Sequence, residues 1–246
     1  MNSKNDAFGV QLLAEYRLNK GKDTVELIER DDGYIDTGSL PGSYFANYKR
    51  WKPTQKQAIK LSRGRVLDIG AGAGRHSLYL QRRGFDVTSI DSSPGAIKVC
   101  ELRGIKKVKL MPIEGIGTVR TNSFDTILMF GNNFGLFSNP RKAKTLLRNM
   151  YRITSRNAQI IAETRNPYKT NDPNHLEYQR LNRKQGRMPG QIRIRVRFEK
   201  MISPWFDYLF VSPREMKEIL KGTGWHVRRF ISSADPDYIA VITKEK

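Results

Sequence analysis

The 246-residue chain is 38% hydrophobic and 10% aromatic, which predicts one sizeable folded domain and excludes a disordered chain. A single cysteine, no Cys/His cluster, no signal-peptide pattern and no apolar run near the ~20 residues of a membrane span argue against a disulfide framework, a metal site and membrane contact, and predict a cytoplasmic protein. The formal net charge of +20 favours a polyanionic partner, most often nucleic acid, although the same charge can serve solubility alone.

The first predicted elements belong to an N-terminal arm, residues 1–62. A helix is expected over Ala7–Leu18, a turn-rich stretch over Asp31–Gly42 and a basic helix over Thr54–Leu61. From residue 63 to residue 246 the pattern is that of one α/β domain with a basic insert at about 165–212. The arm and the insert therefore stand outside the main repeating pattern.

Short apolar runs alternate with amphipathic stretches through the first part of that domain. Strands are predicted over Arg65–Ile69, Asp86–Ile90, Lys107–Met111, Phe124–Phe130 and Gln159–Glu163, with helices over Arg75–Arg83, Pro94–Arg103 and Pro140–Ile153. Strands that alternate with helices form right-handed βαβ units. The pattern therefore predicts a doubly wound, mainly parallel α/β sheet.

The last part of the chain reads differently. Within the insert, Gln191–Lys200 alternates strictly between apolar and charged residues, which is typical of a half-exposed strand. A helix over Pro213–Lys221 follows, and then two strands over Trp225–Ile231 and Tyr238–Thr243. This C-terminal hairpin is expected to add an antiparallel edge to the sheet.

Three alternate glycines, Gly70, Gly72 and Gly74, end the first strand and precede a helix, which suits a ligand-binding loop. The spacing differs from the dinucleotide fingerprint, and Asp68, two residues before the first glycine, would repel a pyrophosphate. S-adenosylmethionine has no phosphate, and its ammonium group suits Asp68 directly or through water. Asp91 ends the second strand, where a carboxylate can accept both hydroxyls of a ribose; a helix N-cap is the alternative.

These motifs resemble those of the class I S-adenosylmethionine-dependent methyltransferases. Leu67–Gly74 looks like their first motif, Ser89–Ser93 like their second, and Ser123–Ile127 like the start of their fourth strand. The resemblance implies a seven-stranded sheet with the last strand antiparallel, S-adenosylmethionine as cofactor, S-adenosylhomocysteine as product and no metal. It also implies an acid at the adenine, for which Glu114 is the candidate. The expected cofactor-binding residues are Asp68, Gly70, Ala71, Gly72, Gly74, Asp91, Ser92, Glu114, Phe130 and Gly131.

Two short motifs are candidates for the acceptor side of the site. In enzymes that methylate amines of nucleic acids, the fourth strand is followed by a polar residue, two prolines and an aromatic ring. Asn132-Asn133-Phe134 has the amide and the ring without the prolines, and Asn166-Pro167-Tyr168 is a near-match after the fifth strand. The catalytic candidates are therefore Asn132, Asn133, Phe134, Asn166 and Tyr168. Each motif could equally be a turn followed by a core aromatic residue.

The excess charge gathers in the arm and the insert. Three guanidinium groups would stand ~6.6 Å apart along one strand face, and a second basic group lies beside aromatic residues. The candidate RNA contacts are Arg193, Arg195, Arg197, Lys49, Arg50 and Lys52. A solvated edge strand is the alternative for the arginine row.

These groups favour a methyltransferase that acts on a base nitrogen or exocyclic amine of ribosomal or transfer RNA. The alternative is a small-molecule methyltransferase; a protein methyltransferase and a non-catalytic RNA-binding module also remain open. A closed apolar pocket under the insert would favour a small acceptor, and an open basic groove would favour RNA.

Overall fold

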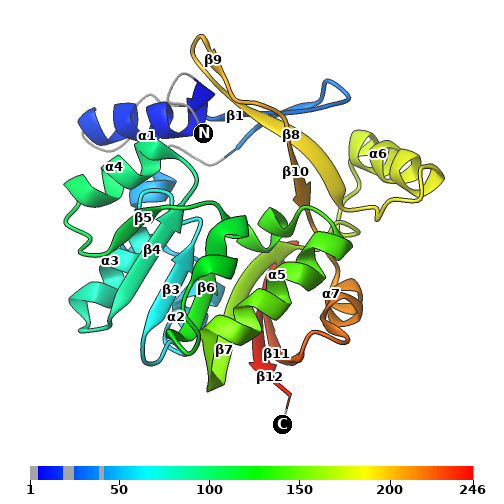
Figure 1. Ribbon diagram of the computed structural model, residues 1–246. Coiled ribbons are helices and arrows are strands. Elements are labelled where there is room, and N and C mark those ends of the chain that lie inside the picture. Colours follow the sequence, from blue (N-terminus) through cyan, green and yellow to red (C-terminus); the bar gives the residue numbers. More distant parts are fainter. Residues whose placement is uncertain (1–4, 19–24, 39–41, 246) are drawn as a thin grey trace.

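The computed structural model describes residues 5–18, 25–38 and 42–245 (Figure 1). These residues form two β-sheets with helices packed against them. Residues 1–4 and 19–24 of the predicted arm, residues 39–41 of the predicted turn-rich stretch and residue 246 of the predicted main domain lie outside the described residues. None of the described helices combines the length and apolarity that crossing a bilayer requires.

The central sheet has seven strands in the order β11-β12-β7-β6-β3-β4-β5. The parallel strands are β3 (Val66–Ile69), β4 (Val87–Asp91), β5 (Val108–Leu110), β6 (Phe124–Met129) and β7 (Thr154–Arg165). The last strand, β12 (Asp237–Lys244), pairs antiparallel with β7, and β11 (Trp225–Ser232) forms the edge. The predicted fold class is confirmed, since this is a doubly wound α/β sheet with an antiparallel C-terminal hairpin.

Helices cover both faces of the central sheet. They are α2 (Pro53–Ile59), α3 (Arg75–Arg82), α4 (Pro94–Leu102), α5 (Pro140–Ile153) and α7 (Pro213–Leu220). Ile127 and Met129 of β6 pack into the core on the α5 and α7 side, whereas Leu128 between them packs with residues of α2 and α3. Consecutive side chains point to opposite faces, so the successive apolar residues of β6 fit a strand that is covered on both faces.

A second sheet, which we call the covering sheet, joins the arm to the insert. Its strands are β1 (Leu27–Arg30), β2 (Ile35–Thr37), β8 (Gln191–Phe198), β9 (Met201–Ile202) and β10 (Phe206–Leu209). The pairing of β1 with β8 is antiparallel and sets Ile28 opposite Val196. The stretch Asp31–Gly42, which was predicted to be rich in turns, contains the strand β2. The strand predicted at Gln191–Lys200 is confirmed as β8.

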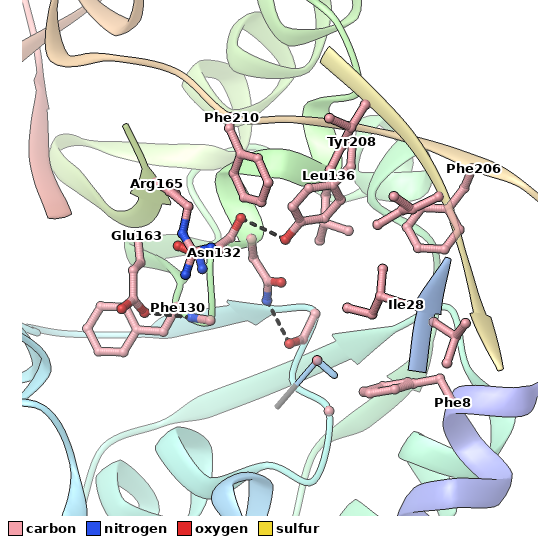
Figure 2. Close-up of a pocket in the computed structure, with 18 of the residues that line it drawn as sticks. Phe8, Ile28, Phe130, Asn132, Leu136, Glu163, Arg165, Phe206, Tyr208 and Phe210 are labelled. Carbon is pink, nitrogen blue, oxygen red and sulfur yellow. Dashed lines mark hydrogen bonds between the residues drawn. The ribbon is translucent and has the colours of Figure 1, made fainter. Parts of the chain in front are cut away.

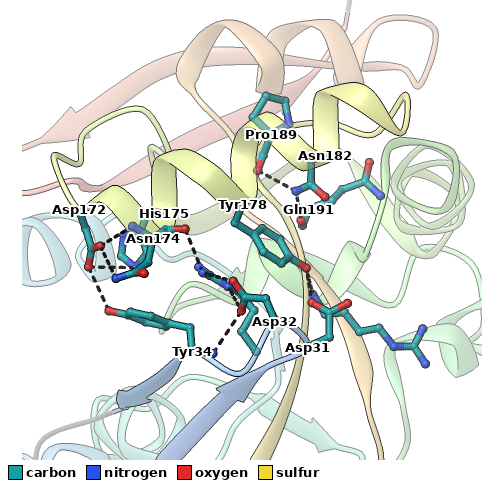
Figure 3. Close-up of polar contacts among 12 residues, drawn as sticks. Asp31, Asp32, Tyr34, Asp172, Asn174, His175, Tyr178, Asn182, Pro189 and Gln191 are labelled. Atoms are coloured by element: carbon teal, nitrogen blue, oxygen red, sulfur yellow. Dashed lines mark hydrogen bonds and ion pairs between the residues drawn. The ribbon is translucent and has the colours of Figure 1, made fainter.

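Helix α6 (Pro173–Lys184), which the sequence did not predict, fixes the arm to the insert (Figure 3). The guanidinium group of Arg30 lies between the rings of Tyr34 and Tyr178, 4.7 and 4.2 Å from their centroids. The Tyr178 hydroxyl donates a 2.6 Å hydrogen bond to Asp31, and Arg30 forms a bidentate pair with Asp32. Helix α6 is therefore held against the arm by hydrogen bonds and by the contact of Arg30 with the Tyr178 ring.

Helix α1 (Ala7–Arg17) attaches the other end of the arm to the central sheet. Asp6 caps it by accepting a bond from the backbone N–H of Gly9, and its second oxygen accepts bonds from the Ser93 hydroxyl and the Gly95 N–H of α4. A Cβ on Gly95 would lie 2.5 Å from the backbone of Gly9, so the two helices touch. Figure 1 shows α1 lying across α4 beside the covering sheet.

Four short 3₁₀ helices complete the described elements. They are η2 (Ser43–Phe45), η3 (Tyr48–Arg50), η4 (Ile113–Thr118) and η5 (Asn133–Phe137). Of these, η4 follows β5 and η5 follows β6, so both stand at the ends of parallel strands. Side chains of η4 and η5 therefore lie where the fold places ligands.

Candidate active site

A cavity of about 1390 Å³ lies between the two sheets. Its floor includes Gly70, Asp91 and Gly131 at the ends of β3, β4 and β6, and its roof includes Ile192 and Val196 of β8. A single drug-sized ligand fills roughly 300–1,000 Å³. The cavity therefore has room for a cofactor and an acceptor together.

The glycine loop after β3 is held by a side chain from the loop after β6. Gly70 and Gly72 have φ values of 70° and 56°, a region that L-residues with a Cβ rarely adopt. The Asn133 amide donates bonds of 2.9 and 2.8 Å to the carbonyl oxygens of Ile69 and Gly70. A Cβ on Gly70 would stand 2.5 Å from the Asn133 nitrogen, so the loop has no room for a larger residue.

Asp91 lines the cavity with both carboxylate oxygens held by backbone donors. One oxygen accepts from the N–H of Gly72 and the other from the N–H of Ser93, each at 2.9 Å. Burial is the main reason that its pKa is raised. Ser93, not Asp91, caps α4 through its bond from Ala96, so the N-cap alternative for Asp91 is wrong. Each Asp91 oxygen keeps a lone pair that can accept a ribose hydroxyl.

Asp68 is not among the residues that line the cavity, so of the two predicted contacts with an ammonium group, direct or through water, the direct one does not fit its position. It is buried beneath the glycine loop, where it accepts a 2.6 Å bond from the Ser77 hydroxyl. Ser89 in turn donates to Ser77 at 2.7 Å. Burial raises the pKa of Asp68 to about 6. Asp68 therefore ties α3 to the first two parallel strands.

Most of the other predicted cofactor residues do reach the cavity. Its lining includes Ala71, Gly72, Ser92, Glu114, Phe130 and Gly131. Glu114 forms an ion pair with Lys142, and this lowers its pKa against the opposing effect of burial. Gly74 is outside the lining, and a Cβ there would lie 2.1 Å from the Ile105 side chain. Gly74 thus allows close packing beneath the loop.

The acceptor-side motifs are only partly at the site. Asn132, Asn133 and Asn166 line the cavity. Phe134 is fully buried in the core against Phe137, with their centroids 4.8 Å apart, so its predicted stacking on a base is wrong. Tyr168 is 44% exposed and donates a 2.6 Å bond to Glu215, away from the cavity. The alternative interpretation, a turn with a core aromatic residue, holds for Asn132-Asn133-Phe134.

The acceptor side of the cavity has an aromatic wall that the motifs did not indicate (Figure 2). Phe206, Tyr208 and Phe210 all line it, and adjacent rings meet edge to face at 6.4 and 5.5 Å. The Tyr208 hydroxyl donates a 2.7 Å bond to the carbonyl oxygen of Asn132. Figure 2 shows Phe8 and Ile28 near Phe206, at the end of the cavity away from Phe130. A ring-bearing or apolar acceptor suits this wall.

Sequence reasoning also missed three polar residues at the other end of the cavity. Glu163 lies near the end of the buried run of β7, and its carboxylate accepts bonds from the Gly131 N–H at 2.7 Å and the Gln55 amide at 2.8 Å. Arg75, the first residue of α3, donates to the carbonyl of Ser43 and to Gln55. The sequence did place the Glu163 carboxylate near the end of a predicted parallel strand, and this position could have indicated a ligand-binding residue.

His76 is buried beside these residues. Its ring lies between Trp51 and Phe130, with centroids 4.7 and 4.8 Å away. Burial holds its pKa well below the usual value, so the imidazole is neutral. It therefore contributes an uncharged wall to the cavity.

The arginine row of β8 lies on the face opposite the cavity and has acidic partners. Arg195 and Arg197 both pair with Glu29 of β1, at 2.9 and 2.5 Å, and Arg193 lies 3.6 Å from Asp207. None of the three is among the described lining residues.

The second basic group is divided. Arg50 and Lys52 both line the cavity, where Lys52 pairs with Asp237 at 2.6 Å, and Lys49 is exposed. Their predicted contact with RNA stays a prediction.

Comparison with known proteins gives one domain match. A family described as "Methyltransferase domain" matches residues 66–157. A ubiquinone biosynthesis O-methyltransferase from Xanthomonas oryzae is 34% identical over 74 residues, 28% of this chain and 31% of that protein. A tRNA (uracil(54)-C(5))-methyltransferase from Pyrococcus horikoshii is 30% identical over 116 residues, 44% of this chain and 27% of that protein. The chain thus spans about a third or less of the length of these relatives.

The comparison of folds covers the whole chain. A crystal structure of a SAM-dependent methyltransferase from Bacteroides fragilis in complex with S-adenosyl-L-homocysteine has a TM-score of 0.83 and 23% sequence identity. It covers 100% of this chain and 98% of that one, so the covering sheet belongs to the shared fold. The glycine loop and Asp91 line the cavity in positions that fit S-adenosylmethionine. No group of three potential metal ligands occurs in residues 5–18, 25–38 and 42–245.

Proposed function

We propose that this chain, a class I S-adenosylmethionine-dependent methyltransferase, transfers the methyl group of its cofactor to a small molecule bound under the covering sheet. The observation that carries this proposal is the roofed cavity with its aromatic wall of Phe206, Tyr208 and Phe210. Sites for small ligands are concave, largely apolar and covered. A strand of RNA would need an open groove that follows its backbone.

The charge of the cavity supports the same proposal. Lysine and arginine outnumber aspartate and glutamate by 44 to 24 in the whole chain, yet the described cavity lining has eight acidic and seven basic side chains. Several of these bases are already paired, such as Lys52 and Arg165 with Asp237. The excess positive charge therefore lies outside the cavity, where it can serve solubility or a separate contact.

The relatives support both substrate classes to different degrees. The ubiquinone O-methyltransferase acts in the biosynthesis of a small molecule, and the tRNA methyltransferase acts on carbon 5 of a uracil. That second chemistry needs a cysteine nucleophile. Cys100, the sole cysteine, is buried in α4, where burial raises its pKa to about 12, and it does not line the cavity. The comparison with the tRNA enzyme therefore does not extend to its mechanism.

The residues of this chain would act mainly by positioning. S-adenosylmethionine, when bound, supplies a methyl group on a good leaving group. Asp91 is placed to hold a ribose, and the glycine loop lets a ligand approach the backbone closely. The covering sheet, which Tyr208 joins to Asn132, would shield the acceptor from water and orient it, and orientation matters most for an in-line displacement.

The test follows labelled methyl groups from S-adenosylmethionine into a metabolite extract and, separately, into total RNA. We expect label in small molecules, which Asp91→Ala abolishes. Phe206→Ala should reduce it because it removes part of the aromatic wall, whereas Arg197→Gln, whose partner Glu29 does not line the cavity, should not. Label that enters RNA instead, and falls steeply with salt, would overturn the proposal in favour of an RNA substrate.

A further inference from the structure

Two side chains of opposite charge face the cavity without a direct ion-pair partner. They are Arg75 at the start of α3, which is half-buried, and Glu163 near the end of β7, which is buried. Among the described residues neither has an oppositely charged group within 4.0 Å. Other bases in the lining, such as Lys142 and Arg165, do have one.

Gln55 of α2 connects the two charges. Its amide nitrogen donates to both oxygens of Glu163, at 2.8 and 3.1 Å, and its oxygen accepts a 3.3 Å bond from Arg75. One Glu163 oxygen also accepts the 2.7 Å bond from Gly131, so the other oxygen has only the longer bond. Each charged group is therefore oriented, and the two attract each other through Gln55 without forming a direct ion pair.

Burial without a partner is costly for both groups. Glu163 is 3% exposed, and burial raises its pKa; burial likewise lowers the pKa of Arg75. Charged groups that burial perturbs and that face a cavity are candidates for ligand contacts. A ligand that carries a negative and a positive group a few ångströms apart would compensate both.

We propose that Arg75 binds the α-carboxylate and Glu163 the α-ammonium group at the methionine end of S-adenosylmethionine. Arg75 directly follows the glycine loop, and Gly131, which Glu163 holds, directly follows Phe130 at the end of β6. The two charges thus flank the part of the floor where the cofactor would lie. This inference rests on the cofactor binding of the proposed function and is independent of the acceptor. It assigns to Glu163 the role that the sequence suggested for Asp68.

The test compares two ligands by calorimetry. S-adenosylhomocysteine has the amino-acid end, and methylthioadenosine has the same nucleoside thioether without it. We expect Arg75→Gln and Glu163→Gln each to weaken S-adenosylhomocysteine binding roughly 10- to 100-fold, as loss of a charged hydrogen bond does. Methylthioadenosine binding should not change. Arg180→Gln, which alters an exposed pair on α6, is the control and should change neither affinity.

Three outcomes separate the hypotheses. Equal weakening of both ligands would show a structural role and overturn the inference, as would no weakening of either. Glu163→Gln keeps the shape and the bond from Gly131, so a folded variant is expected, and its thermal unfolding verifies this. Failure of the unaltered protein to bind either ligand would instead overturn the cofactor assignment and the proposed function with it.

Discussion

The hydroxyl of Tyr208 in the insert donates a 2.7 Å hydrogen bond to the backbone carbonyl of Asn132, in the loop after β6. Asn132 has a φ of 64°, so its backbone holds a conformation that few residues other than glycine adopt. This one bond joins the roof of the cavity to its floor. The geometry of the acceptor side therefore depends on contacts between segments far apart in the chain.

Tyr208→Phe removes that bond and keeps the ring. We expect the free energy of unfolding to fall by about 1–2 kcal/mol, because a buried hydrogen bond is lost and the Asn132 carbonyl loses its donor. Urea denaturation measures the change. Binding of S-adenosylhomocysteine should change little, since the bond lies on the acceptor side. A large loss of cofactor affinity would contradict this division of the cavity.

Gly70→Ala should disrupt the glycine loop. Its φ of 70° adds backbone strain of about 1–3 kcal/mol, and the new Cβ would meet the Asn133 amide at 2.5 Å. Gly84→Ala is the matched control, since its φ is 86° and nothing lies within 4 Å of the added Cβ. Calorimetry should show at least about tenfold weaker S-adenosylhomocysteine binding for Gly70→Ala alone. Equal effects of the two variants would exclude the contact with Asn133 as the cause.

The ionisation of Asp68 makes the free energy of unfolding depend on pH. Its pKa in the folded protein is about 6, above the 3.8 of an ordinary aspartate. The folded protein therefore favours the protonated form of Asp68. The contribution of this form to the free energy of unfolding is fully present below pH 3.8 and is lost as the pH rises through about 6. A shift of about two units corresponds to about 3 kcal/mol.

Asp68→Asn keeps an oxygen for the Ser77 hydroxyl and cannot ionise. Relative to the unaltered protein, this variant should therefore gain stability between pH 4 and pH 7. Urea denaturation at both pH values tests this. Parallel stability profiles of the two proteins would show that Asp68 does not titrate in this range.

Asp237→Asn should destabilise the edge of the cavity. Asp237 is buried and pairs with two half-exposed cations, Lys52 at 2.6 Å and Arg165 at 2.9 Å. Removing its charge should cost about 2 kcal/mol because both cations lose their partner. Asp86→Asn, at an exposed pair with Lys107, should cost less than about 0.5 kcal/mol. The difference in thermal unfolding midpoints between these variants measures the effect of burial.

The central sheet could be predicted from the sequence because its inner strands, such as β3 and β6, are buried on both faces. Near-continuous apolar runs such as Phe124–Met129 have few other interpretations, and the glycine loop marks where a ligand binds. The covering sheet could not be predicted in the same way. Strands β1 and β2 have only four and three residues, and β1 is paired with a strand from the distant insert.

Helix α6 and Phe134 show two further limits. The buried side of α6 consists of Tyr178, Gln179 and Asn182, so its burial leaves no apolar periodicity in the sequence. An aromatic residue after a strand can turn to the core, as Phe134 does, or to the cavity, as Phe130 does. The choice depends on the path of the backbone through η5, which local sequence does not specify.

The pairing of residue 27 with residue 197 in the covering sheet also has a kinetic consequence. Closing a loop of that length costs chain entropy before any contact repays it, so non-local pairings of this kind slow folding. The βαβ units of the central sheet have much shorter loops to close. During refolding, the central sheet is therefore expected to assemble first and the roof last. The cavity would then be completed only in the slowest step of refolding.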